Sequence, residues 1–278
     1  MAGNNLVYII LDSCRFDSFM RARKPNMDRI GEAQRRYSFA SWTAPSHFSL
    51  LMGQVPHDSP KRVFASEVYK NQFAQWVDRL GVPNLSFKTF VPELCLAGVA
   101  KKHGYRTIAR VSMPVLNPFS GLTRGFDDYK LMSNHNDFAG MVREIEFPRT
   151  ERRFYFFNLG ETHYPYMLDD KSLPKISGLH GVARGMDDLL ARTSDTPTEE
   201  PEFFPHETMQ FLHEQQIRCV EYVDGLIGAL FDKAPPDTHF LIAGDHGELF
   251  GEDDYFGHGP VMHQKCFEVP FLDGRRPA

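Results

Sequence analysis

Two carboxylates and an imidazole follow apolar runs in this sequence, where they could do metal chemistry. Asp12 comes directly after the run at residues 6–11, and Asp245 and His246 follow the run at residues 239–243. Mixed oxygen and nitrogen ligands suit Zn²⁺ or Mn²⁺, whereas Mg²⁺ and Ca²⁺ are less favoured because of the imidazole. If the two run ends meet in space, these side chains could hold a divalent cation.

A hydroxyl that could act as a nucleophile opens the segment TAPSHFSLLMG, which begins at Thr43. Thr43 stands just before Pro45 and a helical run. The N-terminus of a helix carries free N–H groups and the positive end of the helix dipole, which favour an anionic ligand. A hydroxyl that also touches a metal ion has a lowered pKa and can attack near neutral pH. Thr43 would then supply the attacking atom.

Short apolar runs alternate along the chain with segments of helical spacing. Continuous apolar runs are typical of strands covered on both faces of a parallel sheet, and their alternation with helices indicates an α/β fold. In such sheets ligands bind beyond the carboxyl ends of the strands. The expected strands are residues 6–11, 107–111, 154–159, 239–243 and 269–272. The expected helices are residues 25–36, 92–103 and 207–232.

The chain is long enough for a large core, and we expect one catalytic domain over residues 1–278. Residues 193–205 (TSDTPTEEPEFFP) are rich in Pro, Glu and Thr and show no periodicity. Expected strands lie on both sides of this segment. We therefore interpret it as an exposed loop or lid and not as a domain boundary.

Composition excludes several classes of protein. The hydrophobic fraction of 42% and charged fraction of 24% are ordinary for a soluble globular protein. The net charge of −5, without a basic stripe, argues against nucleic-acid binding. The four cysteines are widely spaced, which favours reduced thiols and a cytoplasmic location. The longest apolar run near the start has six residues, so we expect neither a membrane span nor a secretory signal.

Several segments, in this order, resemble the alkaline phosphatase/sulfatase superfamily. They are NLVYIILDSCRFDSF, TAPSHFSLLMG, LAGVAKKHGYRTIARV with GLTRGFDDY, ETHYPY, VEYVDGLIGALFD and AGDHGELFGEDDYFGHG. The resemblance implies a three-layer α/β/α fold with a mostly parallel central sheet. It also makes Asp12, Asp245 and His246 metal ligands, and Thr43 both the nucleophile and a further ligand. Typical relatives continue into a smaller C-terminal subdomain, which we expect this chain to lack, because six residues follow Leu272.

The resemblance also assigns residues around the substrate. His258 would protonate the leaving oxygen, a task that suits a side chain whose pKa lies near the operating pH. The expected substrate-binding residues are His163, His47, Arg15 and Asn117. For the histidines the alternative is a structural role with satisfied hydrogen bonds. For Arg15 the alternative is a salt bridge.

Three departures from the family pattern limit which reaction and which metal ions we expect. Sulfatases that use formylglycine have Cys or Ser where Thr43 stands, and threonine cannot be converted to that aldehyde. Ser13 replaces a second carboxylate, which makes calcium less favoured. Leu159 stands where two-metal members have an Asp, so we expect one metal ion.

The sequence therefore predicts a metal-dependent hydrolase of phosphate monoesters, phosphate diesters or phosphonate esters of a small molecule, acting through a covalent Thr43 intermediate. The alternatives on the same scaffold are a sulfuric-ester hydrolase and a phospho-group transferase. A catalytically silent binding protein is the alternative from another class. We expect an anionic small-molecule ester as the partner, no nucleic acid and no membrane span, and leave homo-oligomerisation open.

Overall fold

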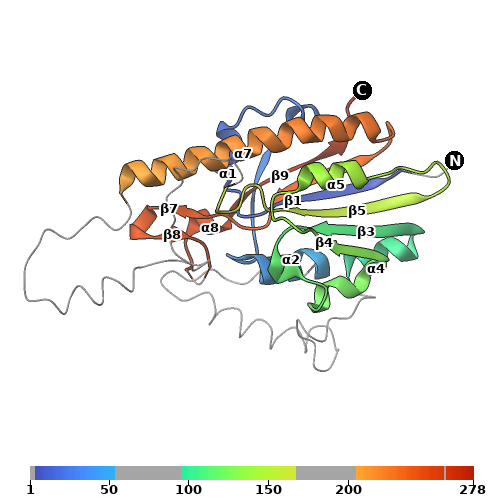
Figure 1. The fold of residues 1–278 in the computed structure, drawn as a ribbon, viewed down its shortest axis with the longest axis horizontal. Coiled ribbons are helices and arrows are strands. Elements are labelled where there is room, and N and C mark those ends of the chain that lie inside the picture. Colours follow the sequence, from blue (N-terminus) through green and yellow to red (C-terminus); the bar gives the residue numbers. More distant parts are fainter. Residues whose placement is uncertain (1–3, 54–94, 167–204, 260) are drawn as a thin grey trace, which may run out of the picture.

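The computed structural model describes residues 4–53, 95–166, 205–259 and 261–278. Its centre is a seven-stranded sheet with the order β2-β9-β6-β1-β5-β3-β4 (Figure 1). The strands are β1 (Leu6–Leu11), β2 (Gln34–Tyr37), β3 (Tyr105–Val111), β4 (Asp128–Leu131), β5 (Arg152–Leu159), β6 (His239–Gly244) and β9 (Glu268–Arg275). The five strands expected from the apolar runs are all present.

The sheet is mostly parallel, as expected. β1 pairs in parallel with β5 and β6, and β3 pairs in parallel with β5 and β4. β9 is antiparallel to both β6 and β2. The carboxyl ends of β1, β5 and β6 therefore lie side by side at one edge of the sheet, with β1 in the middle.

Helices cover both faces of the sheet, which gives the expected three layers (Figure 1). The helices are α1 (Phe16–Arg21), α2 (Thr43–Met52), α4 (Leu96–Lys102), α5 (Phe138–Glu144), α7 (His206–Lys233) and α8 (Gln264–Phe267). One hydrophobic cluster joins α1, α5 and α7 to one face. A second cluster joins α2 and α4 to the other face. Burial of apolar side chains in these two clusters fixes the helices to the sheet.

Helix α7 matches the expected helix at residues 207–232 to within one residue at each end. Its buried residues recur at three- and four-residue intervals, which is the spacing of one helix face. The expected helix at residues 92–103 is present as α4 in its described part. No helix in the four described ranges is both long and apolar enough to span a membrane.

The expected helix at residues 25–36 is wrong. This stretch forms a 3₁₀ turn at Met27–Arg29 and then the strand β2. The carboxylate of Asp224 in α7 accepts the backbone N–H groups of Asn26 and Met27, which fixes the turn. All four residues of β2 are exposed, so the strand depends on its ladder with β9 and has no apolar pattern.

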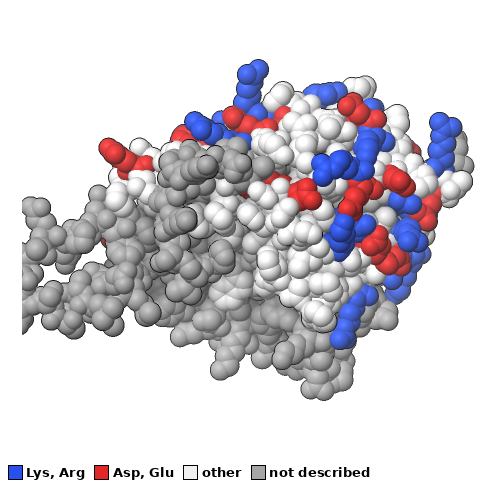
Figure 2. All heavy atoms as spheres, in the orientation of Figure 1, with Lys and Arg blue, Asp and Glu red and all other residues white. Residues whose placement is uncertain are grey.

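The remaining elements are short. The 3₁₀ helices are Met27–Arg29, Pro114–Leu116, Gly121–Gly125 and Glu252–Asp254, and a small hairpin joins β7 (Leu249–Phe250) to β8 (Phe256–Gly257). On the face shown in Figure 2, the basic and acidic side chains of the described residues are interspersed. The loop or lid expected at residues 193–205 lies outside the described residues except for Pro205, which precedes α7.

Candidate active site

The carboxyl ends of two neighbouring strands place the predicted metal ligands together. Asp12 follows β1, and Asp245 and His246 follow β6; Leu11 and Gly244 are paired in register. All three side chains are fully buried. The parallel topology therefore brings together residues that are more than 230 positions apart in the chain.

Four atoms that could bind a metal ion lie close together in this cluster. The Nε2 atom of His246 lies 3.4 Å from Asp245 Oδ2, 3.6 Å from Asp12 Oδ1 and 3.3 Å from Thr43 Oγ1. Thr43 Oγ1 lies 3.4 Å from Asp12 Oδ1. A tetrahedral ion with bonds of about 2.0–2.2 Å has ligand–ligand edges of about 3.3–3.6 Å. The spacing of the four atoms fits such an ion.

Asp245 has one carboxylate oxygen that no described group satisfies. Its Oδ1 atom accepts the backbone N–H groups of Ser13 and His246, at 3.1 and 2.9 Å. Its Oδ2 atom is buried and has no hydrogen-bond partner. A buried carboxylate oxygen without a donor is costly, and a bound cation would remove that cost. The orphaned oxygen is the clearest sign that the cluster fits a metal ion.

The hydrogen bonds of His246 direct one ring nitrogen into the cluster. Nδ1 lies 2.9 Å from the carbonyl oxygen of Gly247, so Nδ1–H donates there. Nε2 is then the unprotonated nitrogen that faces the two carboxylates, as a metal ligand requires.

His47 lies on the other side of the same cluster. Atoms of Asp12, His47 and Asp245 that could hold a metal lie within 4.8 Å of one another. The Nδ1 atom of His47 is 2.9 Å from the Thr43 carbonyl and 3.4 Å from Asp245 Oδ2, and its Nε2 atom is 3.2 Å from Asn158 Nδ2. Both ring nitrogens are engaged and the ring is buried. The structure thus places His47, which was expected to contact substrate, beside the predicted ligands, where it could also contribute to a metal site.

The electrostatics of the cluster favour a cation. Burial raises the pKa of Asp12 and of Asp245, and the neighbouring Asp12 charge raises the pKa of Asp245 further. Burial lowers the pKa of His246 and of His47, so both rings are held neutral. Two buried carboxylates therefore face neutral imidazoles, with no cationic side chain paired to either carboxylate among the described residues. A divalent ion would supply the missing positive charge.

Thr43 is the first residue of α2 and is buried. The helix begins here because Trp42 has an extended backbone and its carbonyl accepts the N–H of Ser46. The Oγ atom of Ser46 in turn donates to the carbonyl of Asp245, at 2.5 Å. The start of α2 is thereby fastened to the end of β6, which sets the position of the Thr43 hydroxyl.

Asn158 belongs to the site although the sequence did not single it out. Its Nδ2 atom donates to Asp12 Oδ2 at 2.8 Å, and its Oδ1 atom accepts the backbone N–H groups of Ser112 and Met113. The side chain is fully buried in β5. The available signal was an amide inside the apolar run FYFFNL, where a polar residue needs buried partners.

Ser13 is a second residue that the sequence left unassigned to the site. It takes φ = 59°, in the left-handed region, so that its N–H reaches Asp245 and its hydroxyl reaches Asp12 at 3.3 Å. Gln216 of α7 donates to the Ser13 carbonyl and to that of Thr162. A strained backbone held by such contacts is typical of functional sites.

His258 and His163 lie together beside the cluster. The ring centroids of His258 and His246 are 4.4 Å apart, and those of His258 and His163 are 5.0 Å apart. His258 Nδ1 lies 3.3 Å from Glu248 Oε1 and 3.4 Å from Ser13 Oγ. Both histidines are therefore placed where they could contact a group bound at the cluster.

The side chains of Arg15 and Asn117 form ion pairs and hydrogen bonds with residues outside the cluster. The guanidinium of Arg15 is buried and pairs with Asp17 at 2.6 Å and with Glu252 at 2.5 Å, which is the salt-bridge alternative. Asn117 is part of an exposed turn, where its side chain bonds to the Pro114 carbonyl and the Phe119 N–H. None of these ion pairs or hydrogen bonds joins Arg15 or Asn117 to a predicted metal ligand.

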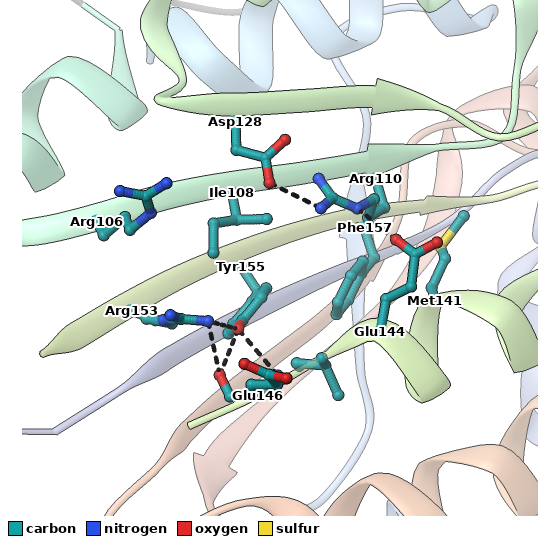
Figure 3. Close-up of a pocket in the computed structure, with 11 residues that line it drawn as sticks. Arg106, Ile108, Arg110, Asp128, Met141, Glu144, Glu146, Arg153, Tyr155 and Phe157 are labelled. Atoms are coloured by element: carbon teal, nitrogen blue, oxygen red, sulfur yellow. Dashed lines mark hydrogen bonds and ion pairs between the residues drawn. The ribbon is translucent and has the colours of Figure 1, made fainter. Parts of the chain in front are cut away.

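A hollow of about 380 Å³ lies elsewhere on the sheet (Figure 3). Its floor is formed by Ile108, Tyr155 and Phe157 of β3 and β5, and charged side chains surround it. None of the predicted site residues lines this hollow. The cluster at the strand ends is therefore distinguished from this hollow by its chemistry.

Comparisons with known proteins agree with this fold. The full chain aligns with a Vibrio parahaemolyticus protein in the alkaline phosphatase superfamily (17% identity, TM-score 0.52, 62% of that chain). The C-terminal periplasmic domain of the Campylobacter jejuni phosphoethanolamine transferase EptC (14%, 0.53) and a 2-O GAG sulfatase (10%, 0.60) each align with 98% of the chain. These alignments cover 80% and 64% of the two neighbours.

The chain thus spans less than two thirds of the length of two of these neighbours. A search of curated proteins found no match. A model of the sulfatase family matches residues 4–272, nearly the whole chain. The protein is therefore a member of the sulfatase family, with a fold of the alkaline phosphatase superfamily.

Proposed function

We propose that this protein is a metal-dependent esterase that transfers a phosphoryl or phosphonyl group from a small-molecule ester to Thr43 and then to water. The observation that carries the proposal is the position of the Thr43 hydroxyl. It stands at a helix N-terminus, 3.3 Å from His246 Nε2 and 3.4 Å from Asp12 Oδ1, beside the unpaired oxygen of Asp245.

Asp12, Asp245, His246 and Thr43 would hold the ion, Zn²⁺ or Mn²⁺, and His47 would support these ligands. When bound, such an ion lowers the pKa of a coordinated hydroxyl and stabilises negative charge on the transferring group. The family membership and the distances among these four residues support this assignment. Asp12 and Asp245 also form a possible metal-binding group with His47.

The residues of the chain then account for each step. Thr43 Oγ1 loses its proton to solvent and bonds to phosphorus while the bond from phosphorus to the leaving oxygen breaks. His258 donates a proton to that oxygen, which departs as an alcohol. Water next attacks the phospho-Thr43 intermediate, releases phosphate or phosphonate and restores the hydroxyl. The backbone N–H groups of Thr43 and Ala44, the first two residues of α2, could donate to the anionic group, whereas Pro45 has no N–H.

Two alternatives share this site. A sulfuric-ester hydrolase is suggested by the family, but the formylglycine route is closed because Thr43 cannot form the aldehyde. A phospho-group transferase would deliver the group from Thr43 to an acceptor alcohol in place of water. The fold neighbours include both a sulfatase and a phosphoethanolamine transferase, so fold alone does not choose.

The test is a rate panel on the metal-stripped protein. Nitrophenyl phosphate, bis(nitrophenyl) phosphate, a nitrophenyl phosphonate and nitrophenyl sulfate are each assayed with Zn²⁺, Mn²⁺, Mg²⁺ or Ca²⁺. We expect turnover of a phosphorus ester with Zn²⁺ or Mn²⁺, and its loss in Thr43→Ala. Preferential sulfate turnover would favour the sulfatase alternative, and added glycerol that captures the group would favour the transferase. No turnover of any ester would contradict the proposal.

A further inference from the structure

Glu248 is a buried carboxylate whose two oxygens are both engaged, one of them by His258. Its side chain is 1% exposed. The Tyr166 hydroxyl donates to Oε2 at 2.6 Å, and Oε1 lies 3.3 Å from Nδ1 of His258. Tyr166 is itself buried, and the pKa of its hydroxyl is raised by burial and by Glu248, so it remains a donor. The three side chains form a chain of contacts that ends at the imidazole.

The fold places Glu248 and His258 opposite each other. In the antiparallel hairpin Leu249 pairs with Gly257, and the residues just outside this pair are Glu248 and His258. Residues that face each other in an antiparallel pair have neighbouring side chains. The hairpin register therefore sets which carboxylate meets the imidazole.

The backbone beneath Glu248 is closely fixed. A Cβ atom on Gly247 would come within 2.0 Å of the Lys265 carbonyl oxygen, so glycine is required for this close approach. The N–H of Gly247 donates to the Cys266 carbonyl, and Arg15 donates to the carbonyl of Glu248 at 3.4 Å. Glu248 is thus held on rigid backbone and not on a free loop.

We propose that Glu248, supported by Tyr166, is the positioning residue that orients His258. A carboxylate accepts hydrogen bonds, so Nδ1 of His258 carries the proton and donates it to Glu248. Nε2 is then the nitrogen left to face a substrate beside His246 and His163. When the ring carries a second proton, that proton is on Nε2 and is the one given to the leaving oxygen, while Nδ1–H stays bonded to Glu248. This role rests on the proposed function of His258 as the proton donor to the leaving group.

The tautomer can be measured without any turnover. Nitrogen-15 NMR of the histidine side chains distinguishes a proton on Nδ1 from one on Nε2. We expect the metal-loaded wild-type protein to show His258 protonated on Nδ1, and Glu248→Ala to show a mixture or the other tautomer. A wild-type His258 protonated on Nε2 alone would overturn the proposal, whatever the protein's activity.

The kinetic test compares good and poor leaving groups. Glu248→Gln keeps the shape of the side chain, and Tyr166→Phe removes only the hydroxyl that donates to Glu248. Neither substitution leaves a large cavity, so both variants should fold. We expect each to lower kcat on phenyl phosphate by about 10- to 100-fold, with little change in KM or on nitrophenyl phosphate, which needs less acid assistance. Glu248→Asp should recover part of the loss. Equal losses on both esters would contradict the role.

The double variant Glu248→Gln with His258→Ala should be no slower on phenyl phosphate than His258→Ala alone, because Glu248 acts through that ring. Additive losses would overturn the proposal. The exposed Asp254→Asn, in the same hairpin loop, is the matched control and should leave both rates unchanged. If the wild-type protein turns over no ester, the proposed function fails while the NMR test of Glu248 still stands.

Discussion

The charged groups of two regions differ. In the cluster of Asp12, Thr43, Asp245 and His246 at the strand ends, the carboxylates are buried and have no cationic partner among the described residues, whereas in the hollow on the sheet they form ion pairs. In the hollow, Arg110 pairs with Asp128 at 2.8 Å and with Glu144 at 3.0 Å, and these pairs are partly exposed (Figure 3). The hydrogen bond from Arg110 holds the pKa of Asp128 below its usual range. In the cluster, burial raises the pKa of both Asp12 and Asp245, and no cationic side chain pairs with them among the described residues.

This difference shows which feature marks the functional site. A balanced, solvated set of ion pairs contributes little and requires no ligand. Two buried carboxylates with one unsatisfied oxygen are unfavourable unless a cation binds. The unbalanced charge of the cluster, and not the volume of the hollow, therefore makes the cluster the candidate active site.

The same substitution should have opposite effects on stability in the two regions. In the presence of EDTA, Asp245→Asn should raise the free energy of unfolding by about 1–3 kcal/mol, because it removes a buried charge without a partner. It should also lower metal affinity and activity by at least about 100-fold. Asp128→Asn should lower stability slightly and leave metal binding unchanged. Denaturant titrations and metal analysis check both, and a destabilised Asp245→Asn protein would break the comparison.

Asn158 tests whether the cluster depends on the residues behind its ligands. Asn158→Ala removes the donor to Asp12 Oδ2, so we expect about a 10- to 100-fold loss of metal affinity or kcat. The exposed Asn134→Ala, near the same strand edge, is the control. Isothermal titration with Zn²⁺ measures the affinity, and an unchanged affinity together with an unchanged kcat would remove Asn158 from the site.

Glu161 is a buried carboxyl that should make the stability of the protein depend on pH. Burial raises its pKa to about 7 from 4.5, and its Oε2 atom has no hydrogen-bond partner. The folded protein therefore binds this proton more tightly than the unfolded chain, so stability from this group is present below pH 4.5 and is lost as pH rises to about 7. Glu161→Gln should be more stable than wild type at pH 8, by up to about 3 kcal/mol, and similar at pH 4. Parallel stability curves across this range would contradict the assignment.

The smallest effects are expected in the hollow. Arg110→Gln should cost about 1 kcal/mol or less, and less at high salt, because its ion pairs are partly exposed. Arg106 pairs in register with Arg153 and has no ion pair among the described residues, so Arg106→Gln should change stability by a few tenths of a kcal/mol at most. Thermal melts at low and high salt measure both. A loss of activity in either variant would show that the hollow serves the reaction.

Much of the site could be predicted because it follows from topology. Apolar runs predicted β1 and β6, and a parallel sheet places whatever follows their carboxyl ends at one edge. The sequence therefore predicts that Asp12 and Asp245 lie close together. Thr43 was predicted from its place at the start of a helix.

The rest depends on contacts that sequence spacing does not contain. Asn158 is uncharged and lies inside an apolar run, so nothing local shows that its amide reaches Asp12. Whether His47 faces substrate or ligands depends on its bonds to Thr43 and Asn158. The sequence predicts a helix where the exposed strand β2 lies, because pairing with β9 leaves no apolar pattern in an exposed strand.

The central claim, that Thr43 carries the transferred group, is tested most directly by rapid acid quenching during turnover of a phosphorus ester, followed by intact mass and peptide mapping. The wild-type protein should gain one phosphoryl group on Thr43. Thr43→Ser should retain some turnover with the label on the same position, and Thr43→Ala should show neither label nor turnover. A label on another side chain would contradict the account, and so would turnover by Thr43→Ala at the wild-type rate.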